Sequence, residues 1–199
     1  LRDSPSLQRM LEARGTHGVD SGAFEREVAA DWIAFSNSKE RYYQIRYIDE
    51  RGYERVRVER IRGQTRVIPP AQLQDKSRRY YFEKAMQLAG GDIDVSPLGL
   101  NREQDLIEIP YRPVLRYATP VALQNGMRAG ILILNLDAIP LLAIVKQESS
   151  SSYESFLVDD MGYYLAHSKA AKEWGSSRDL GHGANLAGDL PGLITSIQT

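Results

Sequence analysis

Hydrophobic positions at the start of the chain recur every three to four residues, which is the spacing of an amphipathic helix. This pattern predicts one helix over residues 5–14 and a second over residues 22–36, with a glycine-containing break between them. Asp20 or Ser21 stands where the N-cap of the second helix is expected. We therefore expect an N-terminal helical region over residues 1–38.

The period then changes to the alternation of hydrophobic and polar residues that is typical of β-strands. Residues 43–48 and 53–61 alternate in this way around the turn sequence at residues 49–52, which predicts a hairpin. A further short strand is expected over residues 65–68, and the two prolines that follow it should end it. The region after the helices is thus expected to open with antiparallel strands.

A third helix is expected over residues 75–89, where Asp75 or Ser77 can cap the start and a pair of glycines follows the end. The Asn125-Gly126 pair further along is a strong signal for a second hairpin. Beyond the third helix the pattern predicts strands over residues 93–95, 106–109, 113–121 and 129–136, and a helix over residues 138–146.

A short motif occurs twice in the chain. Residues 47–53 and residues 157–163 both consist of an apolar strand end, two acidic residues, one further residue, a glycine and a tyrosine. The same pattern is common in hairpins, so the motif alone leaves both interpretations open. Its position after a helix in each case favours an internal repeat, in which residues 158–199 begin a second module that is incomplete or reduced.

Composition excludes several classes of chemistry. The chain contains no cysteine, which excludes disulfides, thiolate metal sites and cysteine nucleophiles. The histidines at positions 17, 167 and 182 are too scattered for a metal site, and neither a nucleophile elbow nor a phosphate loop occurs. We therefore expect no catalytic residue, no metal and no cofactor in this chain.

The charged residues give no general attraction to nucleic acid, because the net charge is −1. Six arginines gather between residues 51 and 66, but acidic residues alternate with them, so we interpret them as a solvated strand face. No apolar run approaches the roughly 18 residues of a membrane span. The chain starts at Leu1 without a signal peptide, so we expect it to be a piece of a longer protein.

The segment from Asp75 to Ala85 combines two arginines with three aromatic residues near a helix start. A guanidinium is a planar fork suited to a carboxylate or phosphate, and a helix N-terminus also favours anions. Aromatic rings can form the apolar walls of a pocket. The alternative is a helix whose aromatic residues enter the core and whose arginines face water, and the residues alone leave both open.

This segment resembles the Asp-x-x-x-Arg-x-Trp-Tyr-x-x-Ala stretch of double Cache domains, which are tandem PAS-like sensor modules on the outside of bacterial receptors. Residues 5–20 and 44–49 are similar to the subset found on sensor histidine kinases and diguanylate cyclases. The matching residues of the central motif are Asp75, Arg79, Tyr81, Phe82 and Ala85, and the later matches are Ser96-Pro97, residues 117–121 and residues 130–137.

The resemblance also implies a ligand site. Family members that bind amino acids carry an aspartate where this chain has Asn135, and they have other residues at Gln74, Tyr81 and Leu98. The resemblance therefore implies a carboxylate or another small anion, held by Arg79, rather than an α-amino acid. The implied site residues are Arg79, Tyr81, Phe82, Tyr117, Asn135 and Asp137.

Two of these positions have an alternative explanation. Asn135 lies on an otherwise apolar strand face and can tie that strand to a loop backbone instead of a ligand. Asp137 stands between a strand and a helix, where an N-cap is the default interpretation.

The resemblance implies an α/β (α+β) fold and an extracytoplasmic, periplasmic sensor domain of an inner-membrane receptor, foremost a sensor histidine kinase. It implies an N-terminal helical region over residues 1–38, a membrane-distal PAS-like module over residues 39–148 and a membrane-proximal module over residues 153–199. The expected partner is a small molecule and not nucleic acid, and the membrane is reached only through helices outside this chain. A homodimer of the full-length receptor is compatible with this scheme.

Three alternatives stay open at this point. The chain can be the sensor domain of a diguanylate cyclase or a chemoreceptor. It can also be a ligand-free structural or dimerisation module, or a hydrolase of unrecognised type.

Overall fold

The computed structural model describes residues 1–14, 21–149 and 152–191. The chain forms two compact units. The first unit comprises residues 1–96 and 116–136, and the second unit comprises residues 97–115 and 137–199. This division differs from the expected one at two places. Residues 97–115 and 137–148, which were expected in the distal module over residues 39–148, fall in the second unit.

Two helices form one layer of the first unit. The α1 helix (Pro5–Arg14) and the α2 helix (Gly22–Ser38) occupy the ranges that the hydrophobic spacing predicts. Ser21 is the N-cap of α2, although its side chain makes no capping hydrogen bond, and Asp20 and the glycine-containing break lie outside the described residues. None of the helices among the described residues is both long and apolar enough to cross a membrane.

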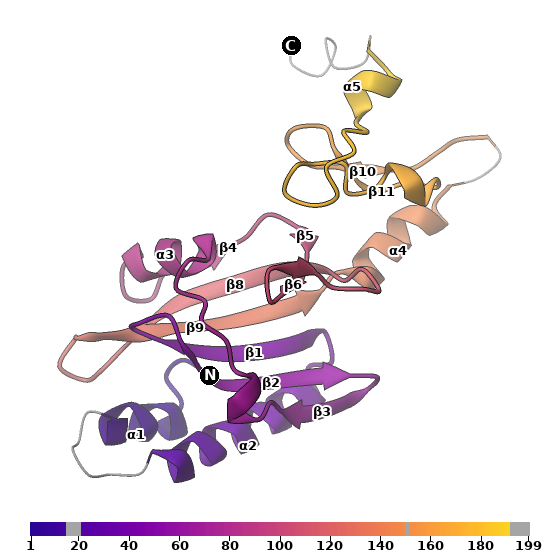
Figure 1. Ribbon diagram of the computed structural model, residues 1–199. Coiled ribbons are helices and arrows are strands. Elements are labelled where there is room, and N and C mark those ends of the chain that lie inside the picture. The colour runs from indigo at the N-terminus through magenta and orange to yellow at the C-terminus, as the bar shows by residue number, and fades with distance from the viewer. Residues whose placement is uncertain (15–20, 150–151, 192–199) are drawn as a thin grey trace. The chain divides into compact units, whose positions relative to one another are not determined.

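An antiparallel sheet forms the second layer, with the strand order β3-β2-β1-β9-β8-β4 (Figure 1). β1 lies in the interior of this sheet, where Ile45 pairs with Val58 on one side and Leu134 on the other. The mixed fold class expected from the sequence is therefore confirmed. The elements are β1 (Tyr42–Asp49), β2 (Glu54–Ile61), β3 (Gln64–Val67), β4 (Asp94–Val95), β8 (Pro113–Ala122), β9 (Arg128–Asp137) and the 3-10 helix η1 (Pro70–Gln72).

Two hydrophobic clusters cover opposite faces of this sheet. Ile45 and Leu132 belong to the cluster that contains α1 and α2, where Trp32 is fully buried. Ile48 and Ile131 belong to the other cluster, which contains residues of α3. Because both faces are covered, every residue of β1 after the first is buried, including the polar ones.

The α3 helix (Tyr80–Gln87) is shorter than the helix predicted over residues 75–89, and that prediction is wrong at both ends. The segment before α3 joins the turn between β1 and β2 instead, where the backbone N–H of Lys76 donates to the carbonyl of Gly52 at 2.7 Å. Asp75 and Ser77 therefore precede the helix and do not cap it. Asp75 forms a β-bridge with Tyr53, Lys76 donates to Gly52, and Ser77 donates its N–H to the Asp75 carboxylate, so these residues do not continue the helix.

The second unit is built from short elements around a small core of its own. β5 (Gly99–Leu100) pairs with the first residues of β8, and two two-stranded sheets accompany it. These are β6 (Arg102–Glu103) with β7 (Leu106–Ile107), and β10 (Leu157–Val158) with β11 (Tyr164–Ala166); the helices are α4 (Ile139–Gln147), η2 (Ala170–Lys172) and α5 (Leu186–Asp189). The core side chains are Leu100, Leu142, Leu165, Ala166 and Trp174.

The motif that occurs twice in the sequence forms the same turn in each unit. Gly52 donates its N–H to the carbonyl of Asp49 at 2.9 Å, and Gly162 donates to the carbonyl of Asp159 at 3.0 Å. In both turns the aspartate carboxylate also accepts two backbone N–H groups, at 3.0–3.1 Å and 2.9–3.0 Å. Residues 157–166 form their own two-stranded sheet, so the sequence repeat is also a repeat of local structure.

Candidate ligand-binding site

Tyr81 lies in the first turn of α3, on the face of the sheet opposite α1 and α2. Its side chain is buried among Phe82, Ala118 and Ile133. Arg79 occupies the N-cap position with an extended backbone, and its guanidinium carbon lies 5.9 Å from the centre of the Tyr81 ring. The start of α3 therefore holds a cation against a buried aromatic ring.

Four cationic side chains approach Tyr81 from different parts of the first unit. The guanidinium carbons of Arg46 on β1 and Arg116 on β8 lie 5.6 Å and 5.7 Å from the ring centre. Burial opposes ionisation of the phenol, but the charges of Arg46, Lys76, Arg116 and Arg79 outweigh it, so the pKa of Tyr81 lies below its ordinary value. This surrounding favours negative charge at the phenol.

Arg46 connects Tyr81 to the interior of the sheet. Its Nη1 donates to the Glu54 carboxylate at 3.3 Å and to the Tyr81 phenol oxygen at 3.4 Å. Its Nη2 donates to Oδ1 of Asn135 on β9 at 3.1 Å. The side chains of Arg46 and Glu54 are 3% and 0% exposed, and such a buried ion pair depends on hydrogen bonds that satisfy its remaining polar atoms.

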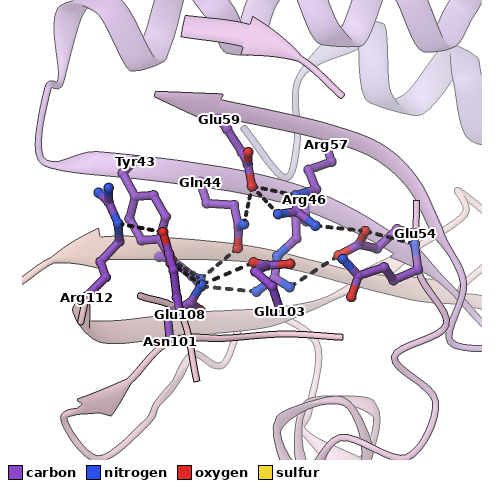
Figure 2. A network of polar contacts seen from close by, with 12 residues as sticks. Tyr43, Gln44, Arg46, Glu54, Arg57, Glu59, Asn101, Glu103, Glu108 and Arg112 are labelled. Atoms are coloured by element: carbon purple, nitrogen blue, oxygen red, sulfur yellow. Dashed lines mark hydrogen bonds and ion pairs between the residues drawn. The ribbon is translucent and has the colours of Figure 1, made fainter. Parts of the chain in front are cut away.

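These contacts continue into a closed loop of polar side chains (Figure 2). Nδ2 of Asn135 donates to Oε1 of Gln44 at 2.8 Å, and Nε2 of Gln44 donates to Glu59 at 2.7 Å. Arg57 closes the loop, because its Nε donates to Glu59 at 2.8 Å and its Nη1 lies 3.5 Å from Glu54. We call these six residues the buried polar ring: Gln44, Arg46, Glu54, Arg57, Glu59 and Asn135.

The structure brings four of the expected site residues to one face of the sheet. Arg79 and Tyr81 are in contact, and Arg46 joins Tyr81 to Asn135. Phe82 packs in the hydrophobic cluster beside Tyr81. The amide of Asn135 is bonded to side chains of the sheet, so the alternative in which it ties the strand to a loop backbone is wrong.

Tyr117 does not join this group, and the expectation that it does is wrong. Its ring packs edge-on against Tyr42 with 6.5 Å between the centres, and Tyr42 in turn packs against Phe35 of α2. Tyr117 therefore faces the α2 side of the sheet, since alternate strand residues point to opposite faces and its neighbour Arg116 faces Tyr81. With Tyr42 and Phe35 it lines a cavity of about 420 Å³ in the first unit.

Asp137 belongs to the second unit, where it has structural partners. The expectation that Asp137 is the N-cap of this helix is wrong, because Ala138 occupies that position before α4 and Asp137 is the last residue of β9. The Asp137 carboxylate instead accepts the backbone N–H of Ile139, two residues later, at 2.9 Å. It also accepts a hydrogen bond from Arg112 at 3.2 Å, and Arg112 donates to Glu108 at 3.3 Å (Figure 2). These contacts account for Asp137 as a structural residue.

Sequence reasoning missed Arg46, Lys76 and Arg116 as members of the site. In the sequence, Arg46 is only the polar residue that alternates with Ile45 and Tyr47 in a predicted strand. Of the arginines between residues 51 and 66, which we interpreted as a solvated strand face, Arg51, Arg62 and Arg66 are exposed. The interpretation is wrong for Arg57, which is buried in the polar ring. An interior strand covered on both faces buries its polar residues, and the hydrophobic pattern of one strand does not contain that information.

The arrangement gathers cationic donors around one aromatic ring, which is chemistry that suits a small anion. Guanidinium groups present forked donors to a carboxylate or phosphate. The guanidinium groups of Arg46 and Arg79 both lie against the buried ring of Tyr81. A ligand carboxylate at Arg79 would also meet the positive field of the other three cations near Tyr81.

Comparison with known proteins gives one family and a group of structures. The family model described as bacterial histidine kinase, sensor domain, matches residues 20–198. A comparison with curated protein sequences found no match.

Three solved structures are similar over more than nine-tenths of this chain, and the first two have the higher TM-scores. A domain of a putative sensory box/GGDEF family protein from Vibrio parahaemolyticus is 25% identical with a TM-score of 0.82, covering 98% of this chain and 71% of that one. The extracellular domain of the putative histidine kinase vpHK1S-Z8 is 24% identical with a TM-score of 0.82, covering 98% and 68%. The ligand-binding domain of the Pseudomonas aeruginosa PAO1 amino acid chemoreceptor PctC, in complex with GABA, is 17% identical with a TM-score of 0.53, covering 93% and 75%.

Proposed function

Because the chain belongs to the bacterial histidine kinase sensor domain family, we propose that its first unit binds a small carboxylate or a related anion at Arg79 and Tyr81. The observation that carries this proposal is the approach of three guanidinium groups to within 5.6–5.9 Å of one buried tyrosine ring. The chain is the sensing part of its receptor, and the kinase chemistry belongs to other parts of such proteins.

The chemistry of the site favours an anion without an α-ammonium group. An ammonium group needs acceptors, and the nearby carboxylates of Glu54 and Glu59 are bonded to Arg46, Arg57 and Gln44. The side-chain oxygen of Asn135 already accepts from Arg46. PctC has a similar fold and is bound to GABA, whose ammonium group lies three carbons away from the carboxylate, so a carboxylate compound without an α-ammonium group binds a domain of this fold elsewhere.

We place the site on the outer side of the cytoplasmic membrane, in line with the extracellular domain of vpHK1S-Z8, which has a similar fold. An anion that binds one conformation of the sensor more tightly shifts the population of the receptor toward that conformation. Occupancy of the site would then set the activity of the attached kinase.

The test measures the Tm of the 199-residue chain without added anion and in the presence of sodium acetate, disodium succinate or sodium phosphate. The ionic strength is the same in every sample. An anion at about 100 times its Kd stabilises by about 2.7 kcal/mol, which raises the Tm by about 5–10 °C for a chain of this size. Arg79→Ala is expected to abolish the shift while changing the unliganded Tm little.

Arg78→Ala is the matched control, because Arg78 is the exposed neighbour of Arg79 and should leave the shift intact. Loss of the shift in both variants would point to general charge attraction rather than a site. A large fall in the unliganded Tm of Arg79→Ala would identify Arg79 as structural, and the absence of any shift in the parent chain would favour a ligand-free module.

A further inference from the structure

The two copies of the turn have a further feature in common, which lies far from them in the sequence. The carbonyl of Gly52 accepts the N–H of Lys76 at 2.7 Å, and the carbonyl of Gly162 accepts the N–H of Leu186 at 2.8 Å. In both copies the donor comes 24 residues after the glycine (76 − 52 and 186 − 162). The tyrosine after each glycine also forms an isolated β-bridge, Tyr53 with Asp75 and Tyr163 with Asn185. Each turn therefore docks a distant segment that leads into a helix.

In the first unit, the docked segment carries two of the cations around Tyr81. Lys76 donates its N–H to the turn, and Arg79 follows three residues later with its own N–H bonded to the carbonyl of Lys76 at 3.0 Å. The Oδ1 of Asp75 accepts the N–H of Ser77 at 2.8 Å, which stiffens the segment between them. The position of the turn thus determines where Lys76 and Arg79 stand relative to Tyr81.

The contact at Gly52 is too close for any other residue. Gly52 has φ +90°, and a Cβ there would overlap the Cα and Cβ of Ser77 and lie 2.7 Å from its backbone nitrogen. The second copy lacks this closeness, because a Cβ at Gly162 would meet only the Cβ of Leu186, at an ordinary 3.7 Å. The two turns share their backbone form, but only the first is pressed against the segment it holds.

The turn itself is fixed from its other side. The Asp49 carboxylate accepts two N–H groups of the turn through Oδ1, at 3.0 and 3.1 Å, and its Oδ2 lies 3.0 Å from Nη2 of Arg14 at the end of α1. The side chain of Asp49 is 4% exposed. A turn held by these contacts can fix the position of residues 75–79, which dock on it.

We propose that Gly52 is a positioning residue of the anion site, because the turn around it seats residues 75–79 so that Lys76 and Arg79 reach Tyr81. This inference rests on the proposed function for the role of the site, but the positioning itself is measurable without any ligand. It assigns a role in binding to a glycine, which has no side chain of its own to offer a ligand.

The test is Gly52→Ala in the 199-residue chain, with Gly63→Ala as the matched control. Gly63 lies in the β2–β3 turn of the same unit with φ +81°, and nothing lies within 4 Å of a Cβ placed there. Both variants therefore impose similar backbone strain, but only Gly52→Ala pushes against Ser77.

Two readouts report the position of the segment. The first readout is the pKa of Tyr81. It comes from the tyrosinate absorbance of each variant as a function of pH, minus that of the same variant with Tyr81→Phe. The second readout is the protection of the Lys76 amide against hydrogen exchange. Gly52→Ala is expected to raise the pKa of Tyr81 toward about 10 and to speed exchange at Lys76 at least tenfold, since Lys76 and Arg79 move away. Gly63→Ala is expected to change neither.

Equal values of both readouts in Gly52→Ala and Gly63→Ala would overturn the proposal. If Gly52→Ala does not fold, Lys76→Pro and Lys76→Ala form a second pair, because both remove the ammonium group but only proline removes the N–H donated to Gly52. A Tyr81 pKa that is the same in these two variants would likewise overturn it. Failure of succinate, acetate and phosphate to bind the parent chain would overturn the proposed function instead, and leave the positioning result standing.

Discussion

Arg46 and Tyr81 are 35 residues apart in the chain, yet Nη1 of Arg46 donates to the phenol oxygen of Tyr81 at 3.4 Å. The guanidinium carbon of Arg46 also lies 5.6 Å from the centre of the ring. This pair joins the start of α3 to the interior strand β1, and it connects the candidate anion site with the buried polar ring. A change of charge in one of these two features is therefore expected to affect the other.

The ionisation of Tyr81 should reflect this surrounding. Since its folded pKa lies below the ordinary value of about 10, the ionised phenol stabilises the fold. The contribution appears as the pH rises through the folded pKa and is complete above the pKa of the unfolded chain. The difference between the absorbance titrations of the parent chain and of Tyr81→Phe should show Tyr81 ionising at a lower pH than a free tyrosine, and a difference curve at or above the ordinary value would contradict this.

Arg116→Met should raise the pKa of Tyr81 by removing one of the nearby charges, while Arg62→Met, an exposed arginine in the β2–β3 turn, should leave it unchanged. An unchanged pKa of Tyr81 in Arg116→Met would show that the charge of Arg116 has no part in favouring the ionised phenol.

The buried polar ring should show strong coupling between Asn135 and Gln44. Asn135→Leu leaves Arg46 and Gln44 with lost hydrogen bonds in a buried position, and we expect a loss of about 1–3 kcal/mol in the free energy of unfolding. Gln44→Leu should cost a similar amount, because it removes the donor to Glu59 at 2.7 Å and the acceptor of the Asn135 amide at 2.8 Å, while Arg57 still donates to Glu59. Urea denaturation of the two single variants and the double variant measures the coupling.

The double variant should lose less than the sum of the single losses, because each substitution already breaks the bond between the two amides. Additive losses would show that the two residues act independently and that the ring has no cooperative character.

The second unit should lose stability at high pH through Tyr164. Burial, together with the hydrogen bond to Asp189 at 2.8 Å, raises the pKa of Tyr164 to about 12. The neutral phenol therefore stabilises the fold below about pH 10, and this contribution is lost as the pH rises toward 12. Asp189→Asn should bring the pKa of Tyr164 down toward about 10, as followed by tyrosinate absorbance; no change would mean that the carboxylate has no part in the shift.

Gly130 should tolerate no side chain. It has φ +131° where β9 pairs with β1, and a Cβ there would overlap the carbonyl of Ile48 and lie 2.8 Å from the Cα of Asp49. Gly130→Ala is expected to cost about 3 kcal/mol or more, which lowers the Tm by about 6–12 °C or prevents folding. Gly126→Ala in the same hairpin, at φ +82° with open space around it, should cost much less in the same melting experiment.

The sequence by itself determined the local structure. Helical spacing predicted α1 and α2, alternation predicted β1, β2, β8 and β9, and the Asn125-Gly126 pair predicted the hairpin between the last two. The repeated turn was also predictable, since it depends on residues that are close in the chain, whereas Arg79 and Tyr81 were placed together only by the family resemblance.

Only the tertiary structure decided which side chains share a site. Residues 75–79 lie outside α3, because the N–H of Lys76 is bonded to the carbonyl of Gly52. Tyr117 lies on the face of the sheet opposite Tyr81, because its neighbour Arg116 faces Tyr81. Arg46 became buried because β1 lies between β2 and β9 with hydrophobic clusters on both faces. Each of these outcomes depends on contacts between residues far apart in the chain, and the periodicity of a single segment cannot encode which distant segment will pack against it.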